Sequence, residues 1–292
     1  MTVGKAMPEG RPVAPGLHLV STPIGAARDI TLRALDILTG AEVLAAEDTR
    51  TLRHLMEIHG IPLAGRPMIA YHDHNGAAAR PRLIAALKEG KSVAYASEAG
   101  TPLVADPGYQ LARAAIEAGV AVLAAPGASA VLCALTVSGL PSDRFTFLGF
   151  LPPRSAARKT VMREVKNWES SLIIYESPHR VKGCLRDLAE VLGGDRQAAV
   201  CRELTKKFEE ISRASLADLV FAFADREVKG EVVIVIDRAE AAAINNADVE
   251  HALAAALQVH SVKEASQIVA EKFGMSKRDA YQMALRLGEG TE

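Results

Sequence analysis

The sequence has few cysteines, and they form no pattern. Cys133, Cys184 and Cys201 are isolated among apolar residues in a chain of 292. This spacing argues against a disulfide framework and a zinc site, and it favours buried thiols in a reducing cytoplasm. The P-loop, the dinucleotide-binding glycine pattern, the serine-hydrolase elbow and the zinc-protease motif are all missing from the sequence. Their absence argues against the common nucleotide hydrolases, dinucleotide dehydrogenases, serine hydrolases and zinc proteases.

The chain also lacks a net charge of either sign. Lys and Arg total 34, Asp and Glu total 35, and the formal net charge is −1. A polyanion would therefore bind at a local basic patch and not through the field of the whole protein. One uncharged stretch, residues 118–140, is long enough to span a membrane. Because glycines and Pro126 interrupt it, we interpret it as a strand followed by a helix and expect no membrane segment.

Apolar runs alternate with helical segments over most of the chain. Between residues 17 and 124 this alternation predicts a largely parallel sheet covered by helices. A second α/β unit is predicted over residues 145–237, with no element between a strand at 198–201 and a helix at 215–224. The fold class is therefore α/β, with two α/β domains and a small helical appendage. The predicted parts are a flexible tail at 1–16, domains at 17–140 and 141–238, a linker at 239–247 and helices at 248–292.

Five loops that are polar or rich in Gly and Pro each follow a predicted strand. They occupy residues 21–25, 46–50, 97–102, 126–130 and 175–180. In open α/β folds, ligands bind beyond the carboxyl ends of the strands, and function is concentrated in loops on rigid scaffolds. The five loops therefore predict one assembled active site.

Three of these loops carry groups that suit a ligand. The Glu98 carboxylate can hold ribose hydroxyls or an ammonium group, or it can cap its own loop. The helix start at Ser129 favours a carboxylate or phosphate, although an ordinary strand–helix turn has the same residues. Asp48 with Arg50 and Arg53 fits either a capped helix start or a grip on phosphates.

Two further patterns have competing interpretations. The segment 154–166 is basic, which fits either a solvated helix face or a patch that binds phosphates. His72 and His74 have no Cys or acidic partner at metal spacing, so we predict no metal site.

Together and in this order, the motifs resemble the tetrapyrrole-methylase superfamily, the class III S-adenosylmethionine (SAM) methyltransferases. Within it, they are most similar to the branch that methylates ribosomal RNA. The resemblance covers about residues 17–237, and the C-terminal helices resemble an appendage that many of these proteins carry. It is carried by Thr-Pro-Ile-Gly at 22–25, Glu-Asp-Thr-Arg at 47–50, His-Asp-His-Asn at 72–75, Ala-Gly-Thr-Pro at 99–102, Glu-Ser-Pro-His-Arg at 176–180 and Arg-Glu-Leu-Thr-Lys at 202–206.

The chain departs from the family pattern at three places. Glu98 stands where the family usually has Asp, and Ala26 stands where it usually has Asn. Residues 126–129 read Pro-Gly-Ala-Ser instead of Pro-Gly-Pro-Ser. Glu98 keeps the charge on a longer arm, whereas Ala26 has no side chain for hydrogen bonding.

The resemblance implies two domains of the tetrapyrrole-methylase type with SAM in the cleft between them. It implies 2'-O-methylation of a cytidine ribose in 16S rRNA of the small ribosomal subunit, by a cytoplasmic homodimer. The alternative is methylation of a tetrapyrrole or another small molecule. The expected SAM contacts are Pro23, Glu98, Ala99, Gly100, Thr101, Leu103, Ser129, Ala130, Tyr175, Ser177, Leu204 and Gly230.

The sequence leaves the proton-accepting base open. The candidates are the acids Asp48, Glu176 and Glu203, together with His74, because histidine is the usual base at neutral pH. Lys206 would act as a base only with a lowered pKa, and it would otherwise orient the ribose. Asp48 paired with Lys206 is the favoured hypothesis. The residues expected to contact RNA phosphates are Arg50, Arg53, Arg154, Arg158 and Lys159.

Overall fold

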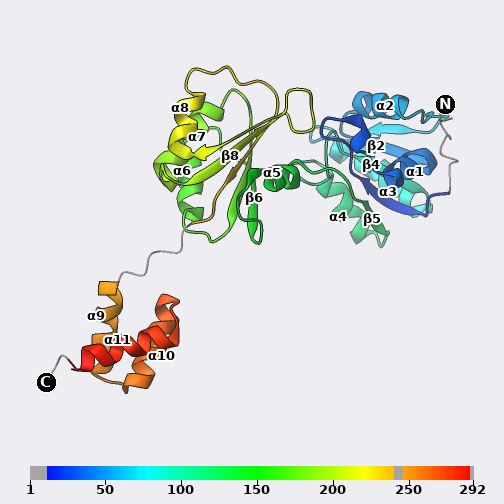
Figure 1. The fold of residues 1–292 in the computed structure, drawn as a ribbon. Helices are drawn as coiled ribbons and strands as arrows, with labels where there is room; N and C mark the ends of the chain where they lie inside the picture. The colour runs from blue at the N-terminus through cyan, green and yellow to red at the C-terminus, as the bar shows by residue number, and fades with distance from the viewer. Residues whose placement is uncertain (1–11, 240–245, 290–292) are drawn as a thin grey trace, which may run out of the picture. The chain divides into compact units, whose positions relative to one another are not determined.

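The computed structural model describes residues 12–239 and 246–289. Within them the chain folds as two compact units (Figure 1). The larger unit contains the described residues up to Lys166 together with Ser170–Asp237, and the smaller contains Asn167–Glu169 and the described residues from Arg238 onward. No helix of the described residues is long and apolar enough to cross a membrane.

The first sheet of the larger unit is entirely parallel, as the alternation predicts. Its strands lie in the order β3-β2-β4-β1-β5. They are β1 (Gly16–Val20), β2 (Val43–Ala46), β3 (Met68–Ala70), β4 (Ser92–Ala96) and β5 (Val122–Ala125). The helices that follow them are α1 (Leu32–Gly40), α2 (Thr49–Ile58), α3 (Gly76–Lys88) and α4 (Tyr109–Glu117), and a short 3₁₀ turn, η1 (Ala27–Asp29), precedes α1.

Alternation of side chains along the strands gives this sheet two apolar faces. Leu44 of β2 packs with residues of α1 and α2, whereas the adjacent residue Val43 packs with residues of α3 and α4. Because both faces are covered, the strands read as continuous apolar runs, as in other buried parallel sheets.

The second sheet is mixed and has the order β6-β7-β10-β8-β9. Only β6 and β7 are parallel, and the other neighbours are antiparallel. The strands are β6 (Phe145–Phe150), β7 (Ser171–Glu176), β8 (Gln197–Arg202), β9 (Glu210–Ser215) and β10 (Val232–Ile236). One face packs against α6 (Ser155–Val165), α7 (Val181–Leu192) and α8 (Leu216–Phe223), and the other against α5 (Ala130–Ser138).

The sequence analysis does not predict β9. Its residues, Glu-Ile-Ser-Arg-Ala-Ser, contain no apolar run and are mostly only partly buried. β9 is an edge strand that pairs only with β8. Its hydrogen bonds to β8 and its position at the edge of the sheet give it strand structure without a buried sequence pattern.

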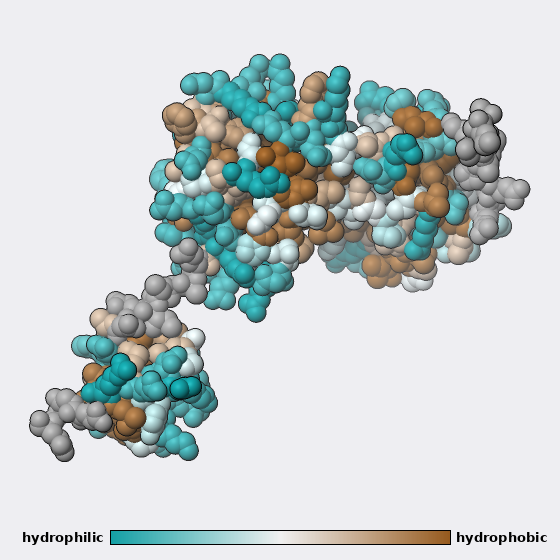
Figure 2. Space-filling model, in the orientation of Figure 1, coloured by the Kyte–Doolittle hydropathy of each residue, from teal (hydrophilic) through white to brown (hydrophobic). Residues whose placement is uncertain are grey.

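Helix α5 connects the two sheets. It follows β5 of the first sheet, but Val131, Ala134 and Leu135 pack against strands of the second sheet. Ser129 caps its N-terminus, and Gly139, with a φ of 76°, ends it in the left-handed conformation. Figure 2 shows apolar residues on the surface in the region of α5, where Leu132 is 53% exposed.

In its described part, the smaller unit contains the helices α9 (Asn246–Leu257), α10 (Val262–Phe273) and α11 (Lys277–Glu289). Val249, Leu253, Val269 and Ala284 form its core. Ser261 and the side chain of Glu264 form a capping box at the start of α10, which satisfies two otherwise free backbone donors.

Substitution of Gly127 with Ala tests the close approach between β1 and the loop after β5. The added Cβ would lie 2.7 Å from Cβ of Ser21, an atom fixed to the backbone, so the two segments would have to separate. We expect the free energy of unfolding to fall by about 1–3 kcal/mol in urea titrations. As a control, Gly183→Ala in α7 adds a Cβ whose nearest neighbour is 3.7 Å away; it is expected to be neutral or stabilising. Equal losses in both variants would contradict this account.

Candidate functional site

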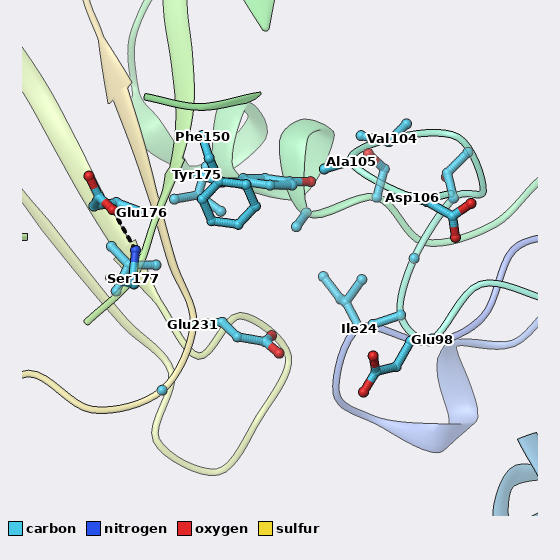
Figure 3. Close-up of a pocket in the computed structure, with 18 of the residues that line it drawn as sticks. Ile24, Glu98, Val104, Ala105, Asp106, Phe150, Tyr175, Glu176, Ser177 and Glu231 are labelled. Carbon is cyan, nitrogen blue, oxygen red and sulfur yellow. Dashed lines mark hydrogen bonds between the residues drawn. The ribbon is translucent and has the colours of Figure 1, made fainter. Parts of the chain in front are cut away.

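The five predicted loops meet around one cavity of about 440 Å³ (Figure 3). Each loop contributes to its wall, for example through Ile24 after β1, Glu47 after β2, Glu98 after β4, Ser129 after β5 and Ser177 after β7. The prediction that these loops assemble in one place is therefore confirmed. The volume falls in the range of small-molecule sites.

Backbone contacts hold the loops of the first sheet together. Thr22 and Gly100 exchange two backbone hydrogen bonds of 2.9 and 3.1 Å, and Gly100 adopts a φ of 82° that favours glycine. The Thr101 hydroxyl donates to the carbonyl of Ala128 over 3.0 Å. The loops after β1, β4 and β5 are thus fixed relative to one another before any ligand binds.

One wall of the cavity is aromatic. Phe150 and Tyr175 stand together in Figure 3, with ring centroids 5.6 Å apart, and Phe147 packs on Tyr175 at 4.8 Å. Burial raises the pKa of Tyr175 to about 12, so its phenol is neutral at physiological pH. This wall offers apolar ring faces together with one hydroxyl group.

The other walls are acidic. Glu47, Glu98, Asp106 and Glu231 all line the cavity. Asp106 accepts hydrogen bonds through Oδ1 from the Tyr95 hydroxyl at 2.8 Å and from the Gly108 backbone N–H at 2.7 Å. Its buried Oδ2 has no partner among the described residues. The cavity therefore favours cations and hydroxyl donors and disfavours anions.

Glu47 is partly buried, lines the cavity and forms no ion pair within the described part of the chain. Burial raises the pKa of Glu47 above its ordinary value, and the negative charges of Asp106, Glu98 and Asp73 raise it further. A hydrogen bond from the Glu98 backbone N–H opposes these effects in part. A carboxylate with a raised pKa at a cavity wall is a stronger proton acceptor than an exposed one.

Most of the expected SAM contacts line the cavity. They are Glu98, Ala99, Gly100, Thr101, Ser129, Ala130, Tyr175, Ser177 and Gly230. Pro23, Leu103 and Leu204 are not in its wall. Leu204 is 7% exposed and packs in the core between α5 and the second sheet, so its side chain has a structural role.

Glu176 is not placed to act as a base. Its carboxylate is turned away from the cavity (Figure 3), because alternate residues of β7 face opposite sides of the sheet. The side chain is buried, and Oε1 accepts hydrogen bonds from Arg180 Nε at 2.7 Å and the Ser177 backbone N–H at 2.8 Å. Glu176 is one of the residues that line the cavity, but its carboxylate is held by Arg180 and the Ser177 backbone and does not point into it.

Asp48 is occupied at the start of α2. Its carboxylate accepts from the Arg50 backbone N–H at 2.7 Å and from Arg50 Nη2 at 2.8 Å. These hydrogen bonds lower the pKa of Asp48 to about 2. Asp48 does not line the cavity, so the structure argues against it as the base.

Lys206 and Glu203 form an ion pair at the edge of the site. Lys206 Nζ donates to Glu203 Oε1 at 2.9 Å and to Glu231 Oε2 at 3.1 Å. Burial alone would lower the pKa of Lys206, but hydrogen bonds and attraction to these two acids outweigh it and raise the pKa. Hydrogen bonding to Lys206 lowers the pKa of Glu203 despite partial burial. Both side chains therefore stay charged and are poor bases.

The remaining candidate base and most of the candidate phosphate contacts lie outside the cavity wall. His74 is exposed beside His72 and does not line the cavity. Arg50, Arg53 and Arg154 are exposed. Lys159 is partly buried, and its Nζ is 2.5 Å from Glu190 Oε2.

Arg158 corrects the prediction of a phosphate contact. It is 4% exposed, and its Nε and Nη2 donate to Asp187 Oδ2 at 2.8 and 2.5 Å. It lies on the inner face of α6, where it ties this helix to α7. Counting charges along the sequence could not separate this inward arginine from its exposed neighbours.

The sequence analysis missed several wall residues, among them Glu47, Asp106, Phe150 and Glu231 as ligand contacts. Glu47 lies in the quoted Glu-Asp-Thr-Arg motif and directly follows β2, so its position after a strand was a usable signal. Glu231 reaches the cavity because β10 lies beside β7, with Val232 opposite Glu176. The antiparallel order of the second sheet is not visible in the sequence.

A parallel α/β sheet joined to a mixed sheet, with loops of both around one acidic and aromatic cavity, defines a class of two-sheet α/β enzymes. Residues 16–220 match the family model described as "Tetrapyrrole (Corrin/Porphyrin) Methylases". Residues 243–288 match a second model, described as "RsmI C-terminal HTH domain". The chain belongs to the tetrapyrrole methylase family, and it is a methyltransferase of that family.

Curated relatives are similar over nearly the whole chain. A protein of Mesorhizobium japonicum is 45% identical over 293 residues, which cover 99% of each chain. One of Vibrio cholerae is 41% identical, covering 99% of this chain and 100% of the relative. One of Escherichia coli O157:H7 is 40% identical, covering 92% and 94%. All three are named "Ribosomal RNA small subunit methyltransferase I".

Solved structures share the fold at lower identity. Diphthine synthase matches with a TM-score of 0.59 and 17% identity, covering 76% of this chain and 89% of that one. Uroporphyrin-III-C-methyltransferase of Thermus thermophilus matches with a TM-score of 0.53 and 21% identity, covering 77% and 94%. These likenesses show the tetrapyrrole methylase fold, as the resemblance predicts.

The buried pair of Arg158 and Asp187 gives a stability prediction. Arg158→Met leaves the Asp187 carboxylate buried without its arginine, and we expect a loss of about 3–5 kcal/mol in the free energy of unfolding. The double variant with Asp187→Leu should recover most of this loss, because neither charge is then buried alone. Lys159→Ala, which removes a more exposed partner of Glu190, should cost at most about 1 kcal/mol. No difference between Arg158→Met and Lys159→Ala in chemical denaturation would contradict the assignment.

Proposed function

We propose that the chain transfers a methyl group from SAM to the 2'-hydroxyl of a cytidine ribose in 16S rRNA of the small ribosomal subunit. The similarity to relatives named as small subunit rRNA methyltransferases supports the substrate class. The observation that carries the proposal is the acidic and aromatic cavity lined by loops from both sheets.

The donor set of the cavity fits SAM. The ring faces of Phe150 and Tyr175 suit an adenine base, and the carboxylates of Glu98 and Glu231 suit ribose hydroxyls or an ammonium group. The start of α5 at Ser129 suits a carboxylate. The surrounding negative charge stabilises a sulfonium. When bound, SAM supplies an electrophilic methyl group on that sulfonium.

The chain must then position the ribose and remove its hydroxyl proton. Holding the hydroxyl in line with the methyl group supplies much of the rate increase. We propose that Glu47 accepts the proton on its carboxylate, since it lies at the cavity wall without a cation partner among the described residues. Lys206 keeps its proton and its link to Glu231, so its proposed part is to orient the substrate.

Exposed cations outside the cavity are the proposed contacts for RNA phosphates. Arg50, Arg53 and Arg154 are exposed, whereas Arg158 no longer belongs to this set and Lys159 is held by Glu190. The proposal also includes a homodimer, which the family resemblance implies, and a cytoplasmic location, where small subunits assemble. Light scattering of the purified protein measures the dimer directly.

Methylation of a tetrapyrrole fits the cavity less well. Tetrapyrrole precursors that carry many carboxylates would meet Glu47, Glu98, Asp106 and Glu231, and like charges brought together oppose binding.

Incubation with labelled SAM tests the function. Small subunits from a strain lacking this gene should accept label from the purified protein, and nuclease digestion with mass spectrometry should locate it on the ribose of a cytidine. Label on a base, or transfer to a tetrapyrrole but not to subunits or naked rRNA, would refute the proposal. SAM binding measured by calorimetry shows in each case that the protein is competent.

Substitution of Glu47 with Gln tests the base. We expect kcat to fall by about 10²–10⁴-fold, while SAM affinity changes little. Because the pKa of Glu47 is raised above its ordinary value and the base must be deprotonated, wild-type activity should fall as the pH drops through that raised pKa. Glu47→Gln should lack this acid limb.

Asp48→Asn combined with Lys206→Ala is the matched comparison for the base. Both variants are assayed at saturating SAM and subunits. If the double variant loses turnover while Glu47→Gln keeps wild-type turnover, then Asp48 and Lys206 remove the proton and Glu47 does not.

A further inference from the structure

The loop between β8 and β9, residues 203–209, has a fixed and strained backbone. Glu203 and Thr205 have φ values of 53° and 65°, which cost energy for residues other than glycine. Such strain persists only where surrounding contacts determine it, and it occurs preferentially at functional sites. Leu103 and Ala105, in the cavity loop after β4, also have positive φ values, whereas Ala64, with a φ of 51°, lies in the loop between α2 and β3. Most of the strained positions among the described residues are therefore in loops at the site.

Contacts with the first sheet anchor this loop. The Ala26 backbone N–H donates to the Thr205 hydroxyl over 3.2 Å. A Cβ on Gly25 would lie 2.5 Å from Lys206 Cγ and 2.6 Å from Thr205 Oγ1, so the two loops pack without space between them. Lys206 also reaches Glu231 in the cavity wall. The base of the loop therefore lies at the rim of the cavity.

The acids of the loop are engaged by neighbouring groups, whereas its tip is open to solvent. Glu203 binds Lys206, Glu209 accepts from the Thr205 backbone N–H at 2.6 Å, and Glu210 at the end of the loop pairs with Arg202 and Arg226. Phe208 is 62% exposed, and Lys207 Nζ lies 5.5 Å from the centre of its ring. The tip thus presents one aromatic face and one cation.

We propose that Lys207 and Phe208 form an RNA-contacting surface at the cavity rim, with Phe208 stacking on a nucleobase near the ribose that enters the cavity. This inference rests on the proposed function. An exposed ring beside a cation is the combination that binds single-stranded nucleic acid, because bases stack on the ring while the cation contacts the phosphates. A rigid loop presents the ring without a large ordering cost on binding.

Phe208→Ala is the test, with Phe221→Ala as its matched control. Phe221 lies on α8 and is 86% exposed, so its removal deletes an exposed ring that the proposal does not use. We expect Phe208→Ala to lower kcat/KM for small subunits by about 5–150-fold, mainly through KM, which corresponds to the usual range for one stacked base. Phe221→Ala and the affinity of both variants for SAM should stay near wild type.

Two conservative variants separate stacking from simple apolar contact. Phe208→Trp should keep wild-type KM, because it retains a ring, whereas Phe208→Leu should resemble Phe208→Ala. Full activity in Phe208→Leu or in Phe208→Ala would overturn the proposal. So would a change of molecular mass in light scattering, which would make Phe208 a contact between protein chains.

The outcome for the wild-type protein distinguishes the two proposals. If wild type methylates subunits and Phe208→Ala does so equally well, only the RNA-contacting surface is wrong. If wild type binds SAM but methylates neither subunits nor naked rRNA, the proposed function fails, and the RNA-contacting surface fails with it.

Discussion

Burial of α5 against the second sheet is the interaction on which the site depends. The helix is covalently continuous with β5 of the first sheet, and its apolar side chains Val131, Ala134 and Leu135 lie in the core of the second. Burying a side chain the size of Val or Leu contributes about 1.5–3 kcal/mol. This apolar contact holds the carboxyl end of one sheet against the strand ends of the other. The cavity forms where they meet, and the N-terminus of α5 is part of its wall.

The charges of the larger unit serve two different purposes. Away from the cavity, acids are matched with cations, as in Arg158 with Asp187 and Arg226 with Glu210. These pairs hold helices and strands together. At the cavity, Glu47, Glu98 and Asp106 face one another with few cations near them, and repulsion and burial raise the pKa of Glu47. Unmatched charge is costly to a fold, so its concentration here sets the cavity apart from the rest of the unit.

The sequence predicted the fold class, the parallel first sheet and the loops that form the cavity, because these depend on local patterns. Buried parallel strands produce apolar runs, and loops at their ends produce Gly, Pro and polar clusters. The edge strand β9 has no such pattern, and its structure comes from pairing with β8. The direction of a side chain was equally hidden: Glu176 and Arg158 stand in polar motifs, but they face the interior. Glu231 reaches the cavity only through the order of strands in the second sheet.

That strand order has a consequence for the synthesis of the protein. β10 is the last strand of the described residues, yet it lies in the middle of the second sheet between β7 and β8. Residues 230–233 at its start complete the cavity wall. On the ribosome, β7 and β8 emerge before the strand that separates them, so the second sheet cannot reach its final pairing until nearly the entire larger unit has left the exit tunnel. The nascent chain therefore cannot complete the cavity before β10 is in place, and a chain that ends before β10 lacks both the centre of its second sheet and part of the cavity wall.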